Sequence, residues 1–341
     1  MTGHVGKVKE PKNIVVIGAG IGGMCAAARL ARAGHHVSLY EASNLPGGKC
    51  RTEWIGRYAF DTGPSLLTIP AVYRDFFQRT GKQMGFEMEL LPVDPSFDYR
   101  FHDGKGVQFS NLSRKKTLAA ITESFDAEAA TQWDSTLQRA ERMWDVSREP
   151  FVESELRSPL SLLKRRHIFR DLRIIAPRAT LRDFGLSNPY LAKIMDRYAT
   201  YSGSDPRYAP AVLSTIAFVE EAFGAWHVEG GLGGLATTLE SRVRDLGVDL
   251  QLNSAVANIL LKNQEAIGVK LIDGSEHFAD VVVANADADL IYNKLLPNVR
   301  KTKSPRKALK KATPSLSGFS LLLGLSGKSD LGHHTVFFPE N

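Results

Sequence analysis

The feature that most constrains this sequence is an apolar run that passes directly into a glycine-rich turn, IVVIGAGIGGMCAAARL, at residues 14–30. The apolar run predicts a short buried strand over residues 13–17. The small-residue pattern after the glycines predicts a helix over residues 21–33, which Gly34 ends. Residues 37–41 predict a second strand. Together these elements predict a β-α-β unit and hence an α/β fold.

The glycines in the turn have the spacing G-x-G-x-x-G, at Gly18, Gly20 and Gly23. In a strand-turn-helix unit the first glycine makes the tight turn, the second lets the backbone approach a pyrophosphate, and the third lets the helix pack closely on the strand. The helix N-terminus then offers free amides and the positive end of its dipole to the phosphates. The candidate pyrophosphate-binding residues are Gly18, Ala19, Gly20, Ile21, Gly22 and Gly23.

An acidic residue, Glu41, ends the second predicted strand. It follows the last glycine by about 20 residues, the spacing at which a carboxylate accepts hydrogen bonds from the ribose of a dinucleotide. A carboxylate there would repel the 2′-phosphate of NADP. The glycines and Glu41 therefore predict an adenine dinucleotide site, and they fit NAD and FAD equally well.

A second pair of glycines follows in NLPGGKCRT, where Gly47 and Gly48 lie beside the cations Lys49 and Arg51. Two glycines next to cations fit a second close approach of backbone to an anionic ligand, and a plain Pro-Gly turn is the alternative. Further on, FDTGPS places Gly63, Pro64 and Ser65 just past a predicted hairpin. This segment is either a structural turn or a loop that lines a flavin ring.

The motifs GAGIGG, YEASNLPGGKCRT and FDTGPSLLT, followed by YATYSGSDPRYAPAVLSTIAFVEEAFGAWHVEGGLGGLATTLE and FADVVVANADADLIY, cover nearly the whole chain. As a set they resemble the bacterial-type phytoene desaturases and their relatives. These are FAD-dependent carotenoid desaturases and oxidases of the wider flavin amine oxidase superfamily. The resemblance implies FAD as the cofactor, with its pyrophosphate at the first glycine turn and its adenosine ribose at Glu41.

The resemblance also gives roles to residues for which spacing alone predicts none. It places Gly47 and Gly48 in a second glycine motif, with Lys49 where the family usually has arginine. It places Arg51 near the flavin and the segment Gly63, Pro64 and Ser65 beside the isoalloxazine ring. The backbone of Val256 would meet the adenine.

Secondary-structure patterns predict a discontinuous first domain. Residues 13–80 and 225–297 would share one sheet as a Rossmann-like FAD-binding domain. A helix-rich substrate- or membrane-facing domain, residues 81–224 and 298–341, would be inserted into it, and residues 1–12 would be a disordered lead.

The resemblance implies removal of hydride from a carotenoid precursor, phytoene or a thirty-carbon analogue, to the flavin. No catalytic side chain and no metal site are predicted, because the sequence offers no Ser-His-Asp set and no ligand spacing for a metal. The family carries a further glycine-rich FAD motif near its C-terminus that this sequence does not show. The chain would then be a fragment of a longer desaturase, one half of a split enzyme that needs a second polypeptide to supply this motif, or a truncated and inactive product. Another FAD-dependent oxidoreductase of the superfamily is a separate alternative.

The net charge of +6 is concentrated in two basic segments with interleaved apolar residues, Lys164–Arg182 and Arg300–Lys311. Such segments favour an anionic membrane surface, and a solvated basic face is the alternative. No nucleic-acid-binding motif accompanies the charge. The start lacks a secretory pattern, no run is long enough to span a membrane, and there are only two cysteines, without a C-x-x-C pair. We therefore expect a cytoplasmic protein bound peripherally to the inner face of the cell membrane, with an apolar isoprenoid substrate and no nucleic acid.

Overall fold

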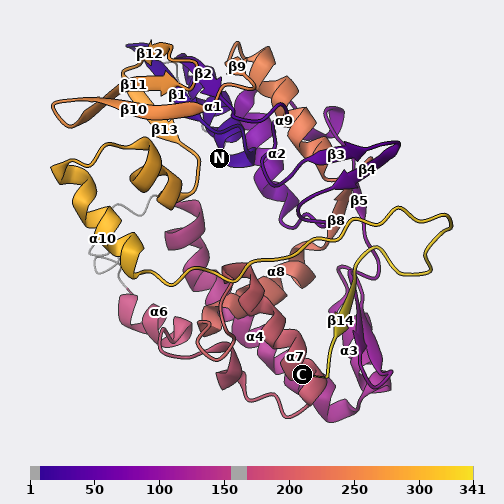
Figure 1. Cartoon of the computed structure of the whole chain (residues 1–341). Coiled ribbons are helices and arrows are strands. Elements are labelled where there is room, and N and C mark those ends of the chain that lie inside the picture. The colour runs from indigo at the N-terminus through magenta and orange to yellow at the C-terminus, as the bar shows by residue number, and fades with distance from the viewer. Residues whose placement is uncertain (1–7, 155–166, 341) are drawn as a thin grey trace. The chain divides into compact units, whose positions relative to one another are not determined.

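The computed structural model describes residues 8–154 and 167–340, and the chain divides into two compact units (Figure 1). The first unit consists of the described residues up to Leu91 together with His227–Thr313. The second consists of the described residues of Pro92–Trp226 and Pro314–Asn341.

The first unit is an α/β unit, and it holds all the predicted cofactor-binding residues. Its elements in chain order are β1 (Asn13–Ile17), α1 (Ile21–Ala33), β2 (His36–Tyr40), β3 (Thr52–Ile55), β4 (Tyr58–Asp61), α2 (Pro70–Thr80), η1 (Met84–Phe86), α9 (Gly233–Asp245), β9 (Asp249–Gln251), β10 (Val256–Lys262), β11 (Glu265–Leu271), β12 (Glu276–Phe278), β13 (Val281–Ala284), η6 (Leu290–Leu295), η7 (Arg300–Thr302) and α10 (Lys303–Lys311). Two short strands, β5 (Leu90–Pro92) and β8 (Trp226–Val228), contain the residues at which the chain passes from one unit to the other.

The main sheet of this unit is parallel, with the strand order β13-β1-β2-β9. Strand β1 is buried from Ile14 to Ile17, and its side chains alternate between the two faces of the sheet. Val15 and Ile17 belong to an apolar cluster with Ile259 and Val269 of the antiparallel ribbon β10-β11-β12. Helices α1 and α9 contact each other, and α1 also contacts β1 and β2. The central strand is thus enclosed by apolar partners, as a parallel strand requires.

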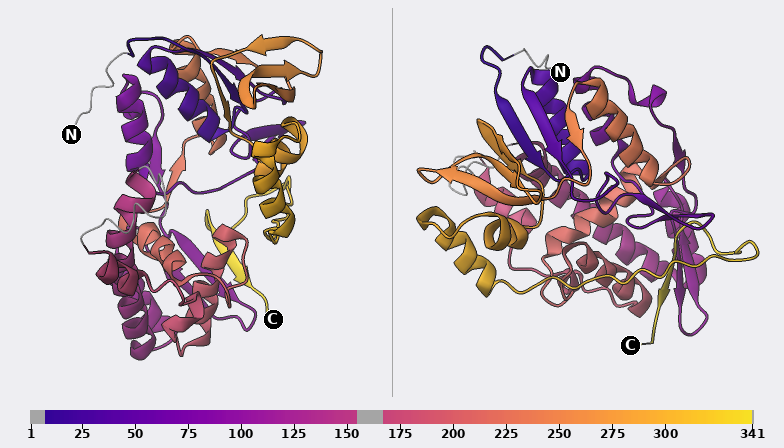
Figure 2. Two further views of the ribbon diagram at one scale, coloured as in Figure 1. Left: turned by 90° about the vertical axis from the view of Figure 1, so that its left-hand side faces the viewer. Right: turned by 45° about the horizontal axis from the view of Figure 1, so that its top comes forward.

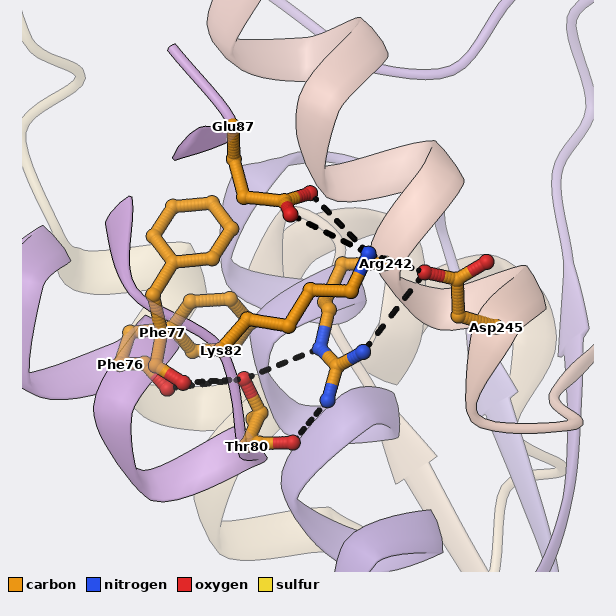
Figure 3. Close-up of polar contacts among 7 residues, drawn as sticks. All are labelled: Phe76, Phe77, Thr80, Lys82, Glu87, Arg242 and Asp245. Carbon is orange, nitrogen blue, oxygen red and sulfur yellow. Dashed lines mark hydrogen bonds and ion pairs between the residues drawn. The ribbon is translucent and has the colours of Figure 1, made fainter. Parts of the chain in front are cut away.

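A polar cluster fixes the C-terminal end of α2 against α9 (Figure 3). The guanidinium of Arg242, which is almost fully buried, donates to the backbone carbonyl and to the hydroxyl of Thr80. A cation at this position satisfies carbonyls that the end of a helix leaves without intrahelical partners. Lys82, just past the helix, forms ion pairs with Glu87 and with Asp245 of α9. These contacts extend the first unit beyond Thr80 to include η1.

The second unit is mainly helical, as Figure 2 shows. Its elements are β6 (Phe97–Phe101), β7 (Gly106–Phe109), α3 (Arg114–Ser124), α4 (Ala127–Arg148), η2 (Glu149–Glu153), α6 (Ile168–Ile175), η3 (Leu181–Phe184), α7 (Pro189–Arg197), η4 (Tyr198–Ser202), η5 (Ala211–Ser214), α8 (Thr215–Phe223) and β14 (Thr335–Phe338). Its sheet has the order β14-β6-β7, with β14 parallel and β7 antiparallel to β6. None of the helices in the described ranges is long and apolar enough to cross a membrane.

A buried charge network lies in the core of the second unit. Arg197 of α7 forms an ion pair with Glu220 of α8, with a distance of 2.8 Å between Nη2 and Oε2. The hydroxyls of Tyr198 and Tyr201 donate to the same carboxylate at 2.9 and 2.6 Å. The guanidinium also lies over the ring of Phe97, 4.5 Å from its centroid. A buried ion pair needs this degree of compensation, because both charges have been removed from water.

The fold class is confirmed: an α/β unit whose parallel sheet combines strands from both ends of the first unit's sequence, with a helix-rich region inserted between them. The carboxylate of Asp126 caps α4 by accepting from Ala129 N at 2.7 Å, as an aspartate just before a helix favours. The predicted domain boundaries differ from those of the structure. The breaks between the units fall after Leu91 and Thr313 rather than after residues 80 and 297, since η1 and α10 pack on first-unit elements. The roles assigned to the two domains stay predictions.

Candidate cofactor-binding site

The first glycine turn connects β1 to α1 in a conformation that side chains would block. Gly18 has φ 94°, in the left-handed region, and a Cβ there would lie 2.6 Å from the carbonyl oxygen of Asn285. A Cβ on Gly23 would lie 1.9 Å from the carbonyl oxygen of Gly18. The turn therefore brings α1 against the strand more closely than any side chain allows. The first amides of α1 have no intrahelical acceptors, so they are available to an anion.

The carboxylate of Glu41 lies at this turn. Its Oε2 accepts a hydrogen bond from Ala19 N at 2.7 Å, and its Oε1 accepts from the backbone N and the hydroxyl of Ser43 at 2.9 and 2.8 Å. The side chain is half-buried. Three protein donors fix the carboxylate, and a carboxylate has about four lone-pair sites, so acceptor capacity remains for a ribose hydroxyl.

The second glycine pair contacts the first turn through backbone. The amide of Gly47 donates to Ala19 O at 2.8 Å, and Gly20 and Gly47 form an isolated parallel bridge. Gly47 and Gly48 have φ 105° and 61°. A Cβ on Gly48 would lie 3.2 Å from the Cα of Gly20. The structure thus brings the two predicted glycine motifs into one site.

The segment that contains Gly63, Pro64 and Ser65 lies against the second glycine turn. A Cβ on Gly63 would be 1.8 Å from the carbonyl oxygen of Lys49, so only glycine fits. The next residue toward the N-terminus, Thr62, donates its backbone N–H to Arg51 O at 3.1 Å. Gly63, Pro64 and Ser65 are all exposed. The three segments that sequence patterns singled out are therefore neighbours in the first unit.

The predicted cations at the second turn differ in their surroundings. Lys49 is exposed. Arg51 forms an ion pair with Glu53 at 2.5 Å and donates to the hydroxyl of Ser43 at 3.4 Å. Since Ser43 donates in turn to Glu41, Arg51 is connected to the carboxylate of Glu41 through one side chain.

Val256 begins β10 and is half-buried. Two residues before it, Ser254 N donates to the carbonyl oxygen of Glu41 at 2.8 Å. The structure therefore brings the Val256 segment next to the backbone of Glu41.

Asp61 has a structural task at this site. Its carboxylate accepts from the backbone N of Leu232 at 2.6 Å and of Gly233 at 3.1 Å, at the beginning of α9. It also accepts from the hydroxyl of Thr52 at 2.7 Å. A carboxylate at a helix N-terminus satisfies free amides and complements the helix dipole. Asp61 thereby joins the β3-β4 hairpin to the glycine loop before α9.

Asn285 is a site residue that the sequence patterns did not single out. It follows β13, and its Oδ1 accepts from Gly23 N at 3.0 Å. A signal was present in the sequence, because Asn285 is the first polar residue after the apolar run of that strand. Parallel strands present their C-terminal ends at one edge of a sheet, and β1 ends there in the glycine turn.

The two cysteines of the unit are not activated nucleophiles. Burial raises the pKa of the Cys25 thiol to about 11. Burial, followed by the charge of Asp61, raises the pKa of the Cys50 thiol. Both thiols therefore stay protonated near neutral pH, and the site is built for binding rather than for thiolate chemistry.

Comparison with known proteins identifies the family. Residues 21–321 match the family model of the flavin containing amine oxidoreductases. The chain belongs to this family. Its members are flavin-dependent oxidoreductases, and the cofactor of the chain is FAD. The structure fits that cofactor, because the two glycine turns bring backbone together at the N-terminus of α1 more closely than side chains would allow, and Glu41 is fixed beside them.

Among curated proteins, the chain is 30% identical over 349 residues to 4,4'-diapolycopene oxygenase of Methylomonas sp, covering 97% of this chain and 67% of that protein. It is 30% identical over 332 residues to 4,4'-diaponeurosporene oxygenase of Staphylococcus aureus, covering 97% of this chain and 66% of that protein. The chain thus spans about two thirds of the length of these relatives.

Solved structures show the same fold at lower identity. An oxidoreductase from Methanosarcina mazei superposes with a TM-score of 0.60 at 18% identity, over 89% of this chain and 66% of that one. A redesigned putrescine oxidase superposes with a TM-score of 0.58 at 16% identity, over 86% of this chain and 62% of that one. The fold class is therefore that of the FAD-dependent oxidoreductases.

Proposed function

We propose that the protein takes part in FAD-dependent oxidation of an apolar isoprenoid polyene in carotenoid biosynthesis. The observation that carries this proposal is the 30% identity, over 97% of the chain, to enzymes named for thirty-carbon carotenoids. Our specific proposal is desaturation, in which hydrogen is removed from adjacent carbons of phytoene or of a thirty-carbon analogue. The names of the relatives make oxygenation of such a polyene the second candidate.

The residues of the first unit would bind and orient the cofactor. The amides of the first glycine turn and the N-terminus of α1 would hold the diphosphate, and Glu41 would accept from the ribose. The second glycine turn and the Gly63 segment would lie along the rest of the cofactor, and the backbone of Val256 would meet the adenine. When bound, FAD accepts a hydride from the substrate and so supplies the redox chemistry. The protein contributes binding, orientation and exclusion of water, which is consistent with the absence of a predicted catalytic dyad.

The test is a reconstitution with two substrates. Purified chain is loaded with FAD and incubated with phytoene or with its thirty-carbon analogue in liposomes, and the products are analysed by chromatography and mass spectrometry. Desaturation removes hydrogen and shifts the absorption to longer wavelength, whereas oxygenation adds an oxygen atom. A flavin-loaded chain that modifies neither polyene, with or without a second polypeptide, would contradict the proposal.

An extended segment of the second unit supports the proposal that a second polypeptide segment completes the enzyme. Residues 314–325 form no helix or strand, and Leu316 N donates to Gly203 O at 2.8 Å (Figure 2). A series of apolar side chains at every second position is exposed: Phe319, Leu321, Leu323 and Leu325, at 91, 69, 62 and 58%. All residues of this segment except Leu322 are exposed. An exposed apolar segment with free backbone groups favours pairing with further polypeptide, and the relatives have about a third of their length outside the match.

The chain is therefore to be purified alone and after co-expression with the polypeptide of the adjoining reading frame. Hydrogen exchange of residues 314–325 and the flavin content are measured in both samples. We expect slow exchange and full flavin only with the second polypeptide. Slow exchange and full flavin in the chain alone would contradict this proposal.

We also propose that basic apolar segments bind an anionic membrane surface on the cytoplasmic side. In the second unit, α6 exposes Phe169 (87%) and Leu172 (41%) next to Arg170 and Arg173. In the first unit, α10 buries none of its residues and carries lysines in its last turn. Exposed apolar side chains next to cations are typical of a helix that lies in a membrane interface. Lys164, at the start of the first basic segment, lies outside the described residues.

Sedimentation with vesicles tests this assignment. The chain is mixed with neutral vesicles and with vesicles that contain phosphatidylglycerol, at low and at high salt. We expect binding to the anionic vesicles only, weakened by salt, and lost when Phe169 and Leu172 are both replaced by serine. The control is Phe86→Ser, since Phe86 of η1 is 85% exposed outside the basic segments. Equal binding to both kinds of vesicle would contradict the proposal.

A further inference from the structure

The position of Asn285 is fixed by the main sheet. Strand β13 pairs in parallel with β1, and Ala284 lies opposite Ile17, the last residue before the glycine turn. The backbone N–H of Asn285 then donates to Ile17 O at 2.8 Å. The hydrogen-bonded pairing of β1 and β13 therefore continues for one residue beyond β13. It holds the side chain of Asn285 at the N-terminus of α1.

The orientation of the side-chain amide follows from its hydrogen bond. Gly23 N–H is a donor, so the amide atom that faces it at 3.0 Å must be the oxygen, Oδ1. The nitrogen, Nδ2, consequently lies on the other side of the amide group. A Cβ built on Gly22 would be 2.9 Å from Nδ2, which places this donor against the Cα of Gly22 in the first turn of α1.

This donor can be reached by a ligand. Both Gly22 and Asn285 are exposed. None of the residues that the structure describes accepts a hydrogen bond from Nδ2. The free N–H groups of Nδ2 thus lie beside the first-turn amides that the glycine motif offers to the diphosphate.

We propose that Asn285 is a second diphosphate-binding residue, which holds the glycine turn through Oδ1 and donates from Nδ2 to a phosphate oxygen of FAD. The inference rests on FAD as the cofactor and not on the identity of the substrate. It also gives a reason for asparagine at this position. An aspartate would accept from Gly23 N–H equally well, but it would place a negative charge next to the phosphates.

The alternative is that Asn285 only caps the helix, and aspartate distinguishes the two roles. Asn285→Asp keeps the acceptor, removes the donor and adds a charge, whereas Asn285→Ala removes both acceptor and donor. If Asn285 binds phosphate, the aspartate variant binds the cofactor more weakly than the alanine variant. If Asn285 only caps α1 and its amide does not face the diphosphate, the aspartate variant behaves like wild type.

The experiment measures the dissociation constants of FAD and of ADP for the full chain by isothermal titration calorimetry, at low and at high salt. ADP carries the diphosphate without the flavin, so it reports on this half of the site alone. For both ligands we expect affinity to fall about tenfold in Asn285→Ala, because one charge-assisted hydrogen bond to the phosphate is lost. We expect it to fall about a hundredfold in Asn285→Asp, because the new carboxylate also repels the phosphate. The loss in Asn285→Asp should shrink at high salt because the site is exposed.

Asn263→Asp is the matched control, because it makes the same change of charge in the exposed turn between β10 and β11. It should leave both dissociation constants unchanged. Circular dichroism of the ligand-free variants monitors folding, and Asn285→Asp decides the question even if Asn285→Ala does not fold. The proposal is overturned if Asn285→Asp binds FAD and ADP as tightly as the wild type does, or more tightly than Asn285→Ala does. Unfolding of Asn285→Asp also overturns it. A wild-type chain that binds neither ligand overturns it as well. Turnover plays no part in these readouts, so they are independent of the proposed reaction.

Discussion

Each unit of the molecule contains a glutamate that accepts hydrogen bonds from three protein donors, and the two carboxylates differ in every other respect. Glu41 in the first unit accepts from two backbone amides and one hydroxyl. Glu220 in the second unit accepts from the guanidinium of Arg197 and from the hydroxyls of Tyr198 and Tyr201. Glu41 is half-buried at the N-terminus of a helix, whereas Glu220 is 4% exposed in the core.

The comparison shows that the number of hydrogen bonds does not distinguish a binding group from a structural group. The negative charge of Glu220 is balanced by Arg197, whose guanidinium lies over the rings of Phe97 and Tyr198, and the residue is buried in the core. No cation is recorded on the carboxylate of Glu41 among the described residues. Its donors are neutral, and it keeps capacity to accept from a sugar. The two residues should therefore respond oppositely to substitution.

The largest effect is expected for Glu220→Ala. Removing one partner of a buried ion pair leaves Arg197 uncompensated, and we expect the free energy of unfolding to fall by about 3–5 kcal/mol. Tryptophan fluorescence during urea unfolding measures it, because Trp133 and Trp144 lie in the second unit. Glu123→Ala, an exposed change on α3, is the control. Replacing Glu220 by leucine and Arg197 by methionine together should recover much of the loss. A double variant no more stable than Glu220→Ala would show that the ion pair itself contributes the stability.

Glu41→Ala should affect cofactor binding and leave stability nearly unchanged. The substitution removes the acceptor for Ala19 N and for the ribose hydroxyls, so we expect FAD affinity to fall about 10- to 100-fold. Equilibrium titration of flavin fluorescence measures the affinity, and Glu265→Ala, at the exposed first residue of β11, is the control. An unchanged dissociation constant would mean that Glu41 is as purely structural as Glu220.

The second unit should also lose stability in acid through His334. Burial, then the positive charges of Arg197 and His333, lower the pKa of His334 from 6.5 to about 4 in the folded chain. Between pH 4 and pH 6.5, His334 is therefore protonated in the unfolded chain and neutral in the folded chain. The contribution of His334 is fully present above pH 6.5 and is lost as pH falls toward 4. Allowing for its partial exposure, we expect a loss of roughly 1–2 kcal/mol.

Urea unfolding between pH 7 and pH 4 measures this dependence in wild type and in His334→Asn. The variant should show a flatter profile, whereas His102→Asn, in the exposed turn after β6, should match wild type. Asp98 is also packed near His334, since its backbone N donates to His334 O at 3.0 Å, so Asp98→Asn is measured as well. If Asp98→Asn flattens the pH profile of stability and His334→Asn does not, the loss of stability in acid is due to the carboxylate of Asp98.

The first unit could be predicted from sequence because its constraints are local. Gly18, Gly23 and Glu41 lie within one β-α-β crossover, where a fixed spacing specifies a tight turn and a carboxylate beside it. The parallel strand at residues 281–284 was also recognisable as an unbroken apolar run, although it lies at the edge of the sheet and is half-buried.

The charge network of the second unit was not predicted, for a physical reason. Arg197 and Glu220 lie on different helices, and nothing in the local pattern of either helix states that they meet. Asn285 was missed for a related reason: its partner Gly23 is far away in sequence, and only the register of β13 on β1 brings them together. The position of Asn285 after an apolar run is a local signal, but its contact with Gly23 is set by the packing of distant elements and has none.

The smallest effect we predict is for Ser43→Ala, and it tests whether Glu41 is held in place as firmly as Glu220. The hydroxyl of Ser43 donates to Glu41 Oε1 and accepts from Arg51 at 3.4 Å, while the backbone N of Ser43 donates to the same carboxylate whatever the side chain. Losing only the hydroxyl should cost about 0.5–1 kcal/mol of FAD binding, or about two- to fivefold in affinity. Ser43→Thr, which keeps the hydroxyl, should bind like wild type. If Ser43→Ala instead weakens FAD as much as Glu41→Ala, the hydroxyl network and not the backbone fixes the carboxylate, and the site of the first unit depends on side-chain contacts just as the core of the second unit does.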